Sequence, residues 1–314
     1  MKLIVQIPCL NEEESLPKTL EALPKHIAGV DVIETLIIND GSTDNTVEVA
    51  KQHGVNHVIS FTKRKGLARA FGAGLDAAVK ADADIIVNTD ADGQYKGEDI
   101  PRLIKPILEG QADIVVGNRD IENIQQFSWI KKRLQRIGST IVRHLANSTV
   151  SDATTGFRAY NREAALKLNI ISNYTYTLES IIQAENKDLA IANITISTNE
   201  VKRKSRLFKS IPEYIKHSIV TIIRIYSMFN PFRLFATIGM TSIAIGTLIG
   251  CRFIFYYLMA SGEGKIQSLI LAAALLTIGF QILIVGLLAD LISANRRLIE
   301  DALLRIKKME LRSK

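Results

Sequence analysis

The sequence predicts an α/β domain with a mostly parallel, Rossmann-like sheet, followed by a juxtamembrane helix and two membrane-spanning helices. Two observations carry this prediction. Short apolar, β-rich runs alternate with helical patterns over residues 1 to about 200, which is typical of βαβ units. Two longer apolar stretches, at about 234–260 and 268–292, could each cross a hydrocarbon core of roughly 30 Å at about 1.5 Å per residue.

Strands and helices of the first half follow each other in a regular order. Runs of Val, Ile and Leu mark the strands, and the segments between them have helical patterns. The expected strands are 3–7, 32–38, 57–61, 85–89 and 113–117, and the expected helices are 15–23, 44–53, 66–80 and 99–108. In such a sheet, ligands bind at the carboxyl ends of the strands.

Each of the two apolar stretches has basic residues at only one of its ends. They gather before the first stretch and after the second, whereas the connecting loop has only Lys265. The positive-inside rule therefore predicts an integral membrane protein with the α/β domain and both termini in the cytoplasm. The expected segments are a domain at 1–205, an amphipathic juxtamembrane segment at 206–230, the two spans within 231–295 and a basic tail at 296–314. A buried helical hairpin and, for 211–228, a plain linker helix are the alternatives.

Composition limits the class of partner only weakly. The net charge of +7 indicates anionic partners, but Lys and Arg concentrate beside the spans, where anionic lipid is a simpler partner than nucleic acid. Cys9 and Cys251 cannot build a disulfide framework or a CxxC metal site, and the His residues are scattered without ligand spacing. Gln281 and Asp290 interrupt the second span, where a polar side chain is unfavourable unless it faces a partner or the interface.

Asp90 and Asp92 stand directly after the apolar run 85–87. Alternate residues at an extended strand end can aim two carboxylates into one cleft. Mg²⁺ and Mn²⁺ prefer such oxygen ligands and often share a site with substrate phosphates. Two acids are too few for a closed cage, which leaves coordination positions for a diphosphate. By itself, however, this spacing is more often a solvated turn.

Further motifs give the acid pair a context. The strands are followed by IPCLNEEESLPKTL, IINDGSTDNT and RKGLARAFGAGLDAA, and later by SDATTGFRAYNREAA and YTLESIIQAENKDLAI. Together with EVKRKSRLFKSIPEYI and the paired spans, they resemble inverting family 2 glycosyltransferases with a GT-A fold. Within that family the pattern is similar to polyprenyl-phosphate sugar transferases, including the dolichol-phosphate mannose synthase group. The resemblance covers nearly the whole chain.

The resemblance implies a site for a UDP- or GDP-linked sugar. Its expected residues are Pro8, Leu10, Glu12, Asp40, Gly66, Arg69, Asp90, Ala91, Asp92, Gln94 and Arg119. Asp90 and Asp92, with Gln94 nearby, would hold Mg²⁺ or Mn²⁺, and Asp40 would accept hydrogen bonds from base or ribose. An ordinary turn and helix cap at 40–44, a solvated Arg69 and a surface Arg119 are the alternatives.

The resemblance also implies an acceptor site for a polyprenyl phosphate. Its expected residues are Arg133, Arg136, Arg203, Ser205 and Arg206. Arg203 matches an arginine that contacts phosphate in the family, and a guanidinium can grip phosphate with two parallel hydrogen bonds. Attraction of these basic segments to membrane lipid alone is the alternative.

Three residues are expected to act in catalysis: Asp152, Asp92 and Arg203. An inverting transfer needs a base or a counter-charge near the attacking oxygen. Since a phosphate acceptor is already ionised near neutral pH, Asp152 would orient and balance charge more than remove a proton. An acid that merely caps the turn at 152–156 is the alternative, and Glu179 has a weaker claim to the same role.

The expected reaction is transfer of one sugar to undecaprenyl or dolichyl phosphate, with inversion, on the cytoplasmic face. A processive polysaccharide synthase is less well supported, because no QxxRW motif is present and two spans are few. A neutral-lipid acceptor and a non-catalytic membrane scaffold are further alternatives; the intact acids argue against a scaffold. A homo-oligomer is expected because membrane relatives often associate through such hairpins.

Overall fold

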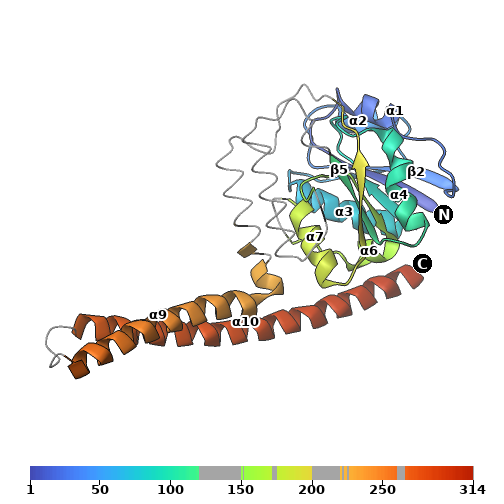
Figure 1. Cartoon of the computed structure of the whole chain (residues 1–314). Coiled ribbons are helices and arrows are strands. Elements are labelled where there is room, and N and C mark those ends of the chain that lie inside the picture. The colour runs from blue at the N-terminus through green and yellow to red at the C-terminus, as the bar shows by residue number, and fades with distance from the viewer. Residues whose placement is uncertain are drawn as a thin grey trace. The chain divides into compact units, whose positions relative to one another are not determined.

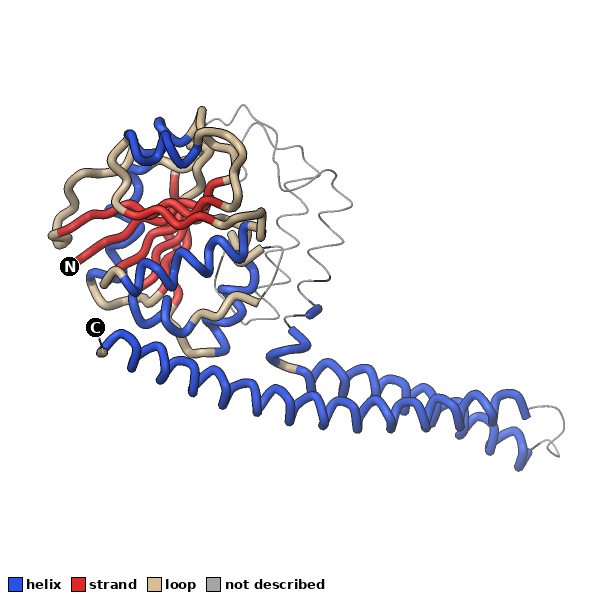
Figure 2. The backbone as a smooth tube through the Cα atoms, turned by 180° about the vertical axis from the view of Figure 1, so that it is seen from behind, coloured by secondary structure: helices blue, strands red, loops and turns tan. Residues whose placement is uncertain are grey.

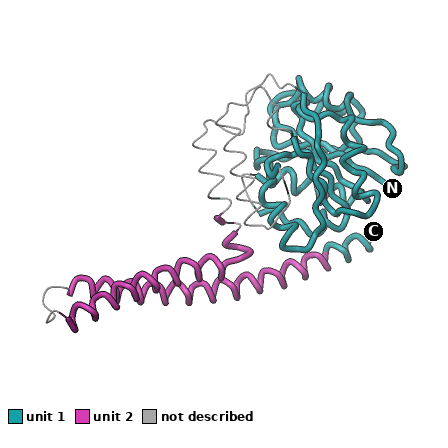
Figure 3. Tube along the Cα trace, viewed as in Figure 1, with its two compact units in different colours: residues 1–222, 307–314 teal, residues 223–306 magenta. Residues whose placement is uncertain are grey.

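The structure is a computed structural model that describes residues 1–119, 150, 152–171, 175–199, 220, 223–224, 226–259 and 266–313. The chain divides into two compact units, residues 1–222 with 307–314, and residues 223–306 (Figure 3). The first unit contains the α/β domain and the second contains a helical hairpin (Figure 1). The expected segment boundaries at 205, 230 and 295 stay predictions.

A seven-stranded sheet forms the centre of the first unit, in the order β3-β2-β1-β4-β6-β5-β7 (Figure 2). Its strands are β1 (Lys2–Cys9), β2 (Val32–Asn39), β3 (His57–Ser60), β4 (Ile85–Asn88), β5 (Ile114–Arg119), β6 (Arg158–Asn161) and β7 (Ile191–Ile196). Strand β6 runs antiparallel to β4 and β5, and the other pairs are parallel. The mostly parallel sheet is thus confirmed, and β6 and β7 are strands that the sequence analysis did not predict.

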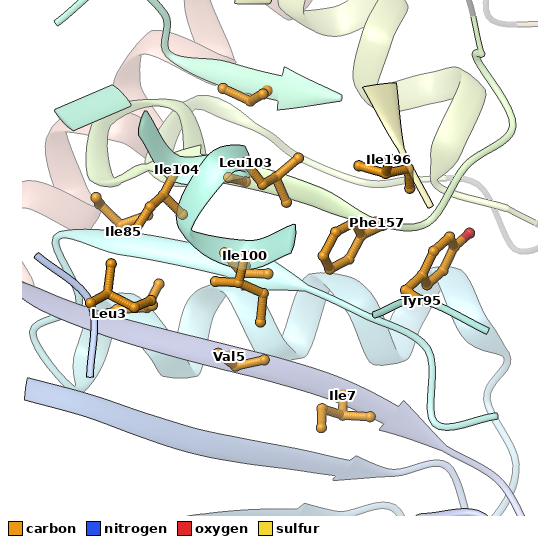
Figure 4. Packing of buried hydrophobic residues seen from close by; sticks show 14 of the residues in the cluster. Leu3, Val5, Ile7, Ile85, Tyr95, Ile100, Leu103, Ile104, Phe157 and Ile196 are labelled. Atoms are coloured by element: carbon orange, nitrogen blue, oxygen red, sulfur yellow. The ribbon is translucent and has the colours of Figure 1, made fainter. Parts of the chain in front are cut away.

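Helices cover both faces of this sheet, so the central strand β1 is buried on both sides. The helices are α1 (Leu16–Glu21), α2 (Thr46–Gln52), α3 (Leu67–Lys80), α4 (Ile100–Leu108), α6 (Arg162–Lys167) and α7 (Thr177–Asn186), with a 3-10 turn at Gly97–Asp99. Leu3, Val5 and Ile7 alternate along β1 and pack against Ile100 and its neighbours on α4 (Figure 4). The intervening β1 residues face α3, where Gly74 lies against Gln6.

The site-forming edge follows from the strand order. Strand β1 lies between β2 and β4: the chain runs from β1 to β2 and β3 on one side, and then crosses back from β3 to β4 on the other side of β1. Such a reversal opens a crevice in α/β sheets, and ligands bind there. The loops at 10–15, 40–45 and 89–96 all leave the sheet at this edge.

The second unit contains α9 (Pro231–Met259) and most of α10 (Ile266–Arg312). By length and composition, both helices could cross a membrane. The expected span at 268–292 lies within α10, and residues 234–259 of the other expected span lie within α9. Helix α10 continues to Arg312, so the residues at 296–314 that are expected to form a basic tail are helical as far as Arg312. Neither Gly nor Pro follows Gly286, and Arg296 pairs with Glu300 one turn later at 2.7 Å, so nothing ends the helix earlier.

Small residues let the two long helices approach closely. Ala272, Gly279, Gly286 and Ser293 are buried on α10 at intervals of seven residues. A Cβ on Gly279 would lie 2.9 Å from the carbonyl oxygen of Gly239 on α9, so the two backbones are in direct contact. The Ser242 hydroxyl donates to the Leu275 carbonyl at 2.9 Å across the pair. Close packing and interhelical hydrogen bonds of this kind stabilise helix pairs in lipid.

Candidate active site

The loops after β1 and β2 are joined to each other by side chains. Asn11 adopts a left-handed backbone (φ 55°), and its amide oxygen accepts from the Thr43 N–H at 2.8 Å. The Glu12 N–H donates to the Thr46 hydroxyl at 2.8 Å, and the Glu12 carboxylate accepts from Ser15. Pro8 is buried in β1 and Leu10 is half-buried just after it. The predicted residues Pro8, Leu10 and Glu12 therefore lie at the carboxyl end of β1, next to a loop that hydrogen bonds fix.

Asp40 lies at the end of β2 and is buried. Its carboxylate accepts from the Lys65 N–H at 2.6 Å and from the Gly66 N–H at 2.9 Å. Gly66 has a φ of 95°, which favours glycine, and it precedes the first turn of α3. The carboxylate thus anchors the loop that enters α3. Its contact with base or ribose stays a prediction, as does the role of Arg69, which is exposed on α3.

The loop that carries the acid pair is held from both sides. The Asp92 carboxylate accepts from the Gln94 N–H at 3.0 Å, which closes the turn. The Thr19 hydroxyl of α1 donates to the Ala91 carbonyl at 3.0 Å. Asn199, after β7, donates from its side chain to Gly93 at 3.0 Å and from its backbone to Gln94 at 2.8 Å. Asp90 and Asp92 are therefore presented on a fixed loop at the predicted edge of the sheet.

The two carboxylates are crowded. Burial is the largest cause that raises the pKa of the Asp90 carboxyl, and the charge of Asp92 is the second. Together they raise this pKa to about 7, although the charge of Arg119 opposes the shift. A bound cation would relieve that repulsion, and two hard oxygen donors suit Mg²⁺ or Mn²⁺. Among the described residues, no cluster of three or more His, Cys, Asp or Glu side chains could hold a metal ion. The acid pair therefore fits an open cation site that a diphosphate would complete.

A polar floor below the acid pair was missed in the sequence. Asn88 is fully buried at the end of β4, and its amide donates to the Gly156 carbonyl and the Tyr176 hydroxyl, both at 2.8 Å. The Tyr95 hydroxyl accepts from the Gly156 N–H at 3.1 Å. A Cβ on Gly156 would lie 3.0 Å from an Asp90 carboxylate oxygen. The one available signal was Asn88 itself, an amide that closes a run of buried Ile and Val.

Arg119 and Asp152 form a buried ion pair. Arg119 ends β5, and its guanidinium donates to the two Asp152 carboxylate oxygens at 2.7 and 3.1 Å and to the Thr154 hydroxyl at 2.8 Å. Asp152 is completely buried, and Arg119 is 7% exposed. Burial alone would raise the pKa of the Asp152 carboxyl, but Arg119 and Thr154 more than offset it and hold that pKa below its usual range. The pair is therefore ionised, and Arg119 is not a surface residue.

The turn at 153–156 is fixed by a second buried arginine. The Arg158 guanidinium donates to the carbonyls of Ala153, Thr155 and Thr177 at 2.8 to 3.0 Å. Glu179 is also buried, and its carboxylate accepts from the Ile171 N–H and the Gln183 amide. These bonds give Glu179 a structural environment beside α7, and its catalytic role stays a prediction.

Residues 4–168 match the family model described as glycosyl transferase family 2. The chain belongs to this family. Polyprenol monophosphomannose synthase of Mycolicibacterium smegmatis is 27% identical, over 63% of this chain and 77% of that protein. The undecaprenyl-phosphate mannosyltransferase of Micrococcus luteus is 32% identical, over 56% and 74%. A UDP-N-acetylglucosamine–dolichyl-phosphate N-acetylglucosaminyltransferase of Methanococcus voltae is 30% identical, over 61% and 83%. The predicted resemblance is confirmed.

Solved structures agree on the fold of this family 2 chain. Glucosyl-3-phosphoglycerate synthase of Mycobacterium tuberculosis, in complex with Mn²⁺, UDP and glucosyl-3-phosphoglycerate, matches with a TM-score of 0.57. That comparison covers 72% of this chain and 78% of the other at 21% identity, and it confirms the GT-A fold. The same enzyme in complex with Mg²⁺ and UDP matches with a TM-score of 0.54.

The structure describes the residues that are predicted to bind the donor, but not those that are predicted to bind the acceptor. Arg133, Arg136, Arg203, Ser205 and Arg206 lie outside the described residues. Their roles stay predictions.

Proposed function

We propose that the protein transfers a single sugar from a nucleotide-sugar donor to a membrane polyprenyl phosphate, with inversion, on the cytoplasmic face of the membrane. The observation that carries the donor half is the crowded acid pair Asp90 and Asp92, fixed at the crevice of a GT-A sheet. The acceptor half is supported by the relatives, whose names contain polyprenol monophosphomannose, undecaprenyl phosphate and dolichyl phosphate.

Asp90 and Asp92, with Gln94 beside them, would hold Mg²⁺ or Mn²⁺ together with the donor diphosphate. When bound, a divalent cation offsets the charge that develops on the leaving nucleoside diphosphate. Complexes of the structurally similar synthase with Mn²⁺ and with Mg²⁺ support a divalent cofactor in this fold. Asp90 and Asp92 would remain ionised in that state and would hold the diphosphate through the cation.

Asp152 would act as a fixed counter-charge and not as a proton acceptor. Its pKa is held below the usual range by Arg119, so it stays ionised at neutral pH. A phosphate acceptor brings its own charged oxygen, which needs no general base. The hydrogen bonds from Arg119 fix the position of the Asp152 carboxylate. The charge of Arg119 also lowers the pKa of Asp90, so Arg119 acts electrostatically on both acids.

The acceptor phosphate would bind to Arg203, Ser205 and Arg206, with Arg133 and Arg136 nearby. In support, Asn199 stands four residues before Arg203 in the sequence and binds the loop that carries Asp92. The basic residues that flank α9 and α10 support insertion with both termini in the cytoplasm. A lipid-linked acceptor would then reach the site from the membrane side.

Radiolabel transfer from a panel of UDP- and GDP-sugars tests this proposal. Purified full-length protein is mixed with undecaprenyl or dolichyl phosphate and Mg²⁺ or Mn²⁺, and lipid extracts are counted. We expect label in a polyprenyl-linked product and none with Asp92→Ala. Label only in polymer or in neutral lipid would overturn the acceptor class. If the protein shows no transfer and no donor hydrolysis, the result would favour a non-catalytic scaffold.

A further inference from the structure

Two amide side chains lie next to each other in the centre of the sheet, Gln6 on β1 and Asn88 on β4. Both are fully buried, and they are opposite each other in the register of the two strands. The Gln6 amide nitrogen donates to the Asn88 oxygen at 2.9 Å. The Asn88 nitrogen donates in turn to the Gly156 carbonyl and to the Tyr176 hydroxyl, both at 2.8 Å. A line of hydrogen bonds therefore runs from β1 through β4 to Gly156.

The Gly156 carbonyl dictates the orientation of both amides. A carbonyl oxygen can only accept, so the Asn88 nitrogen must face Gly156 and the Asn88 oxygen must face Gln6. Gln6 must then present its nitrogen to Asn88, which turns its oxygen towards Gly74. This oxygen is buried and has no hydrogen-bond partner in the part of the chain that the structure describes. Since an unsatisfied buried acceptor destabilises a fold, the arrangement indicates a role other than stability.

Gly156 is held through both of its backbone groups. Its carbonyl accepts the bonds described above, and its N–H donates to the Tyr95 hydroxyl at 3.1 Å. The Tyr95 ring stacks on Phe157 with the ring centroids 5.1 Å apart (Figure 4). Gly156 packs in turn against Asp90, because a Cβ on Gly156 would lie 3.0 and 3.2 Å from the two carboxylate oxygens. The position of Gly156 therefore limits where the Asp90 carboxylate can lie.

We propose that Asn88, oriented by Gln6, is a positioning residue for the cation site: through Gly156, it fixes where the Asp90 carboxylate lies. This inference rests on the cation site proposed above. Residues that orient the ligands of a metal commonly change its affinity by about 10- to 100-fold when they are lost. The hydrogen bonds to residues 91–94 hold the backbone of the acid loop, whereas Asn88 acts from the sheet on Asp90 itself.

A role in stability alone predicts a different outcome. If the buried amides only stabilise the sheet, cation affinity should follow the stability of the fold, whichever residue lowers it. Asn161 offers the comparison, because it lies at the opposite end of the β4–β6 pair from Asn88. Its side chain likewise bonds two partners, donating to the Asp113 carboxylate and accepting from the Ala164 N–H, both at 2.7 Å.

Titration of full-length protein with Mn²⁺ alone, followed by the electron paramagnetic resonance signal of free Mn²⁺, tests the proposal. The variants are Asn88→Leu and Gln6→Leu/Asn88→Leu, and Asn161→Leu is the control. The double variant should fold even if the single one does not, because replacing both partners of a buried hydrogen bond by apolar groups can be nearly neutral. We expect Mn²⁺ to bind on the order of tenfold more weakly to both Asn88 variants. The control should keep the wild-type affinity, although its thermal midpoint without Mn²⁺ also falls.

The possible results separate this inference from the proposed function. Wild-type Mn²⁺ affinity in the double variant would overturn the positioning role, as would an equal loss of affinity in Asn161→Leu. A wild type that does not bind Mn²⁺, or that binds it as well as Asp92→Ala does, would overturn the cation site and this inference with it. Transfer activity gives a second readout: saturating Mn²⁺ should restore the rate of Asn88→Leu but not that of Asp92→Ala. A rate that stays low would contradict a role limited to the position of Asp90.

Discussion

The buried pair of Arg119 and Asp152 allows a quantitative prediction. Asp152→Asn keeps the shape of the side chain but removes its charge, so the guanidinium of a 7% exposed arginine loses its counter-charge. Removing one partner of a buried ion pair costs about 3–5 kcal/mol. We therefore expect Asp152→Asn to lower the free energy of unfolding of the α/β domain by roughly that amount at pH 7.

Urea denaturation, followed by circular dichroism of the full-length protein in detergent, measures this change. At a slope of about 2–3 kcal/mol per molar urea, a loss of about 3–5 kcal/mol should lower the midpoint by about 1–2.5 M. Asp31→Asn is the matched control: Asp31 also forms an ion pair, with the N-terminal amine, but its side chain is 84% exposed. We expect the control to leave the midpoint essentially unchanged, because exposed pairs are screened by water and salt.

The same pair predicts how the difference depends on pH. The folded-state pKa of Asp152 is lowered, so its contribution is fully present above the unfolded value of about 3.9 and is lost as pH falls through the folded value. The gap between wild type and Asp152→Asn should therefore close at acid pH. An Asp152→Asn protein with a wild-type midpoint at pH 7 would refute the argument that this pair stabilises the domain.

Three further predictions concern the acid pair and the hairpin. Mn²⁺ should raise the thermal midpoint of the wild type but not of Asp92→Asn, and the shift should grow between about pH 6 and 8, because protons compete for Asp90 with a pKa of about 7. Gly156→Ala should weaken the Mn²⁺-dependent binding of the nucleoside diphosphate, UDP or GDP, that the wild type binds in calorimetry, because its Cβ would approach an Asp90 oxygen to 3.0 Å; unchanged affinity would contradict this contact. Gly279→Leu should separate α9 from α10 and increase proteolysis of the hairpin, since even a Cβ there would lie 2.9 Å from the Gly239 carbonyl; wild-type resistance would count against the close packing.

Local sequence pattern determined much of this fold. The first strands and helices were predicted because alternating and helical periodicities depend on neighbouring residues. The spans were predicted because length and hydropathy are also local properties. Asp90 and Asp92 were assigned to the edge of the sheet because they directly follow the Ile and Val run of β4, which ends at Asn88. Family motifs then supplied the GT-A fold and the reaction class.

Local pattern was less informative where a helix carries mixed charge. The basic segment from 296 resembled a tail by composition, although its apolar residues continue the helical repeat of α10. The sequence shows small residues at intervals of seven on that helix: Ala272, Gly279, Gly286 and Ser293. Only the folded hairpin shows that this face packs against α9, where Gly279 lies against Gly239.

The sequence by itself determined the strands and helices from β1 to β5 and placed Asp90 and Asp92 at the crevice, because both depend on short-range order, whereas β6, β7 and the polar groups below the acid pair emerged only in the folded structure. Tertiary structure alone decided which polar groups pair. Arg119 meets Asp152 across 33 residues, Asp40 anchors Gly66 across 26, and Asn88 reaches Gly156 across 68. Each of these bonds links separate strands or loops, so no local periodicity encodes it. The surroundings then decided the pKa of each buried aspartate. The pKa is raised at Asp90, beside the charge of Asp92, and lowered at Asp152, which pairs with Arg119.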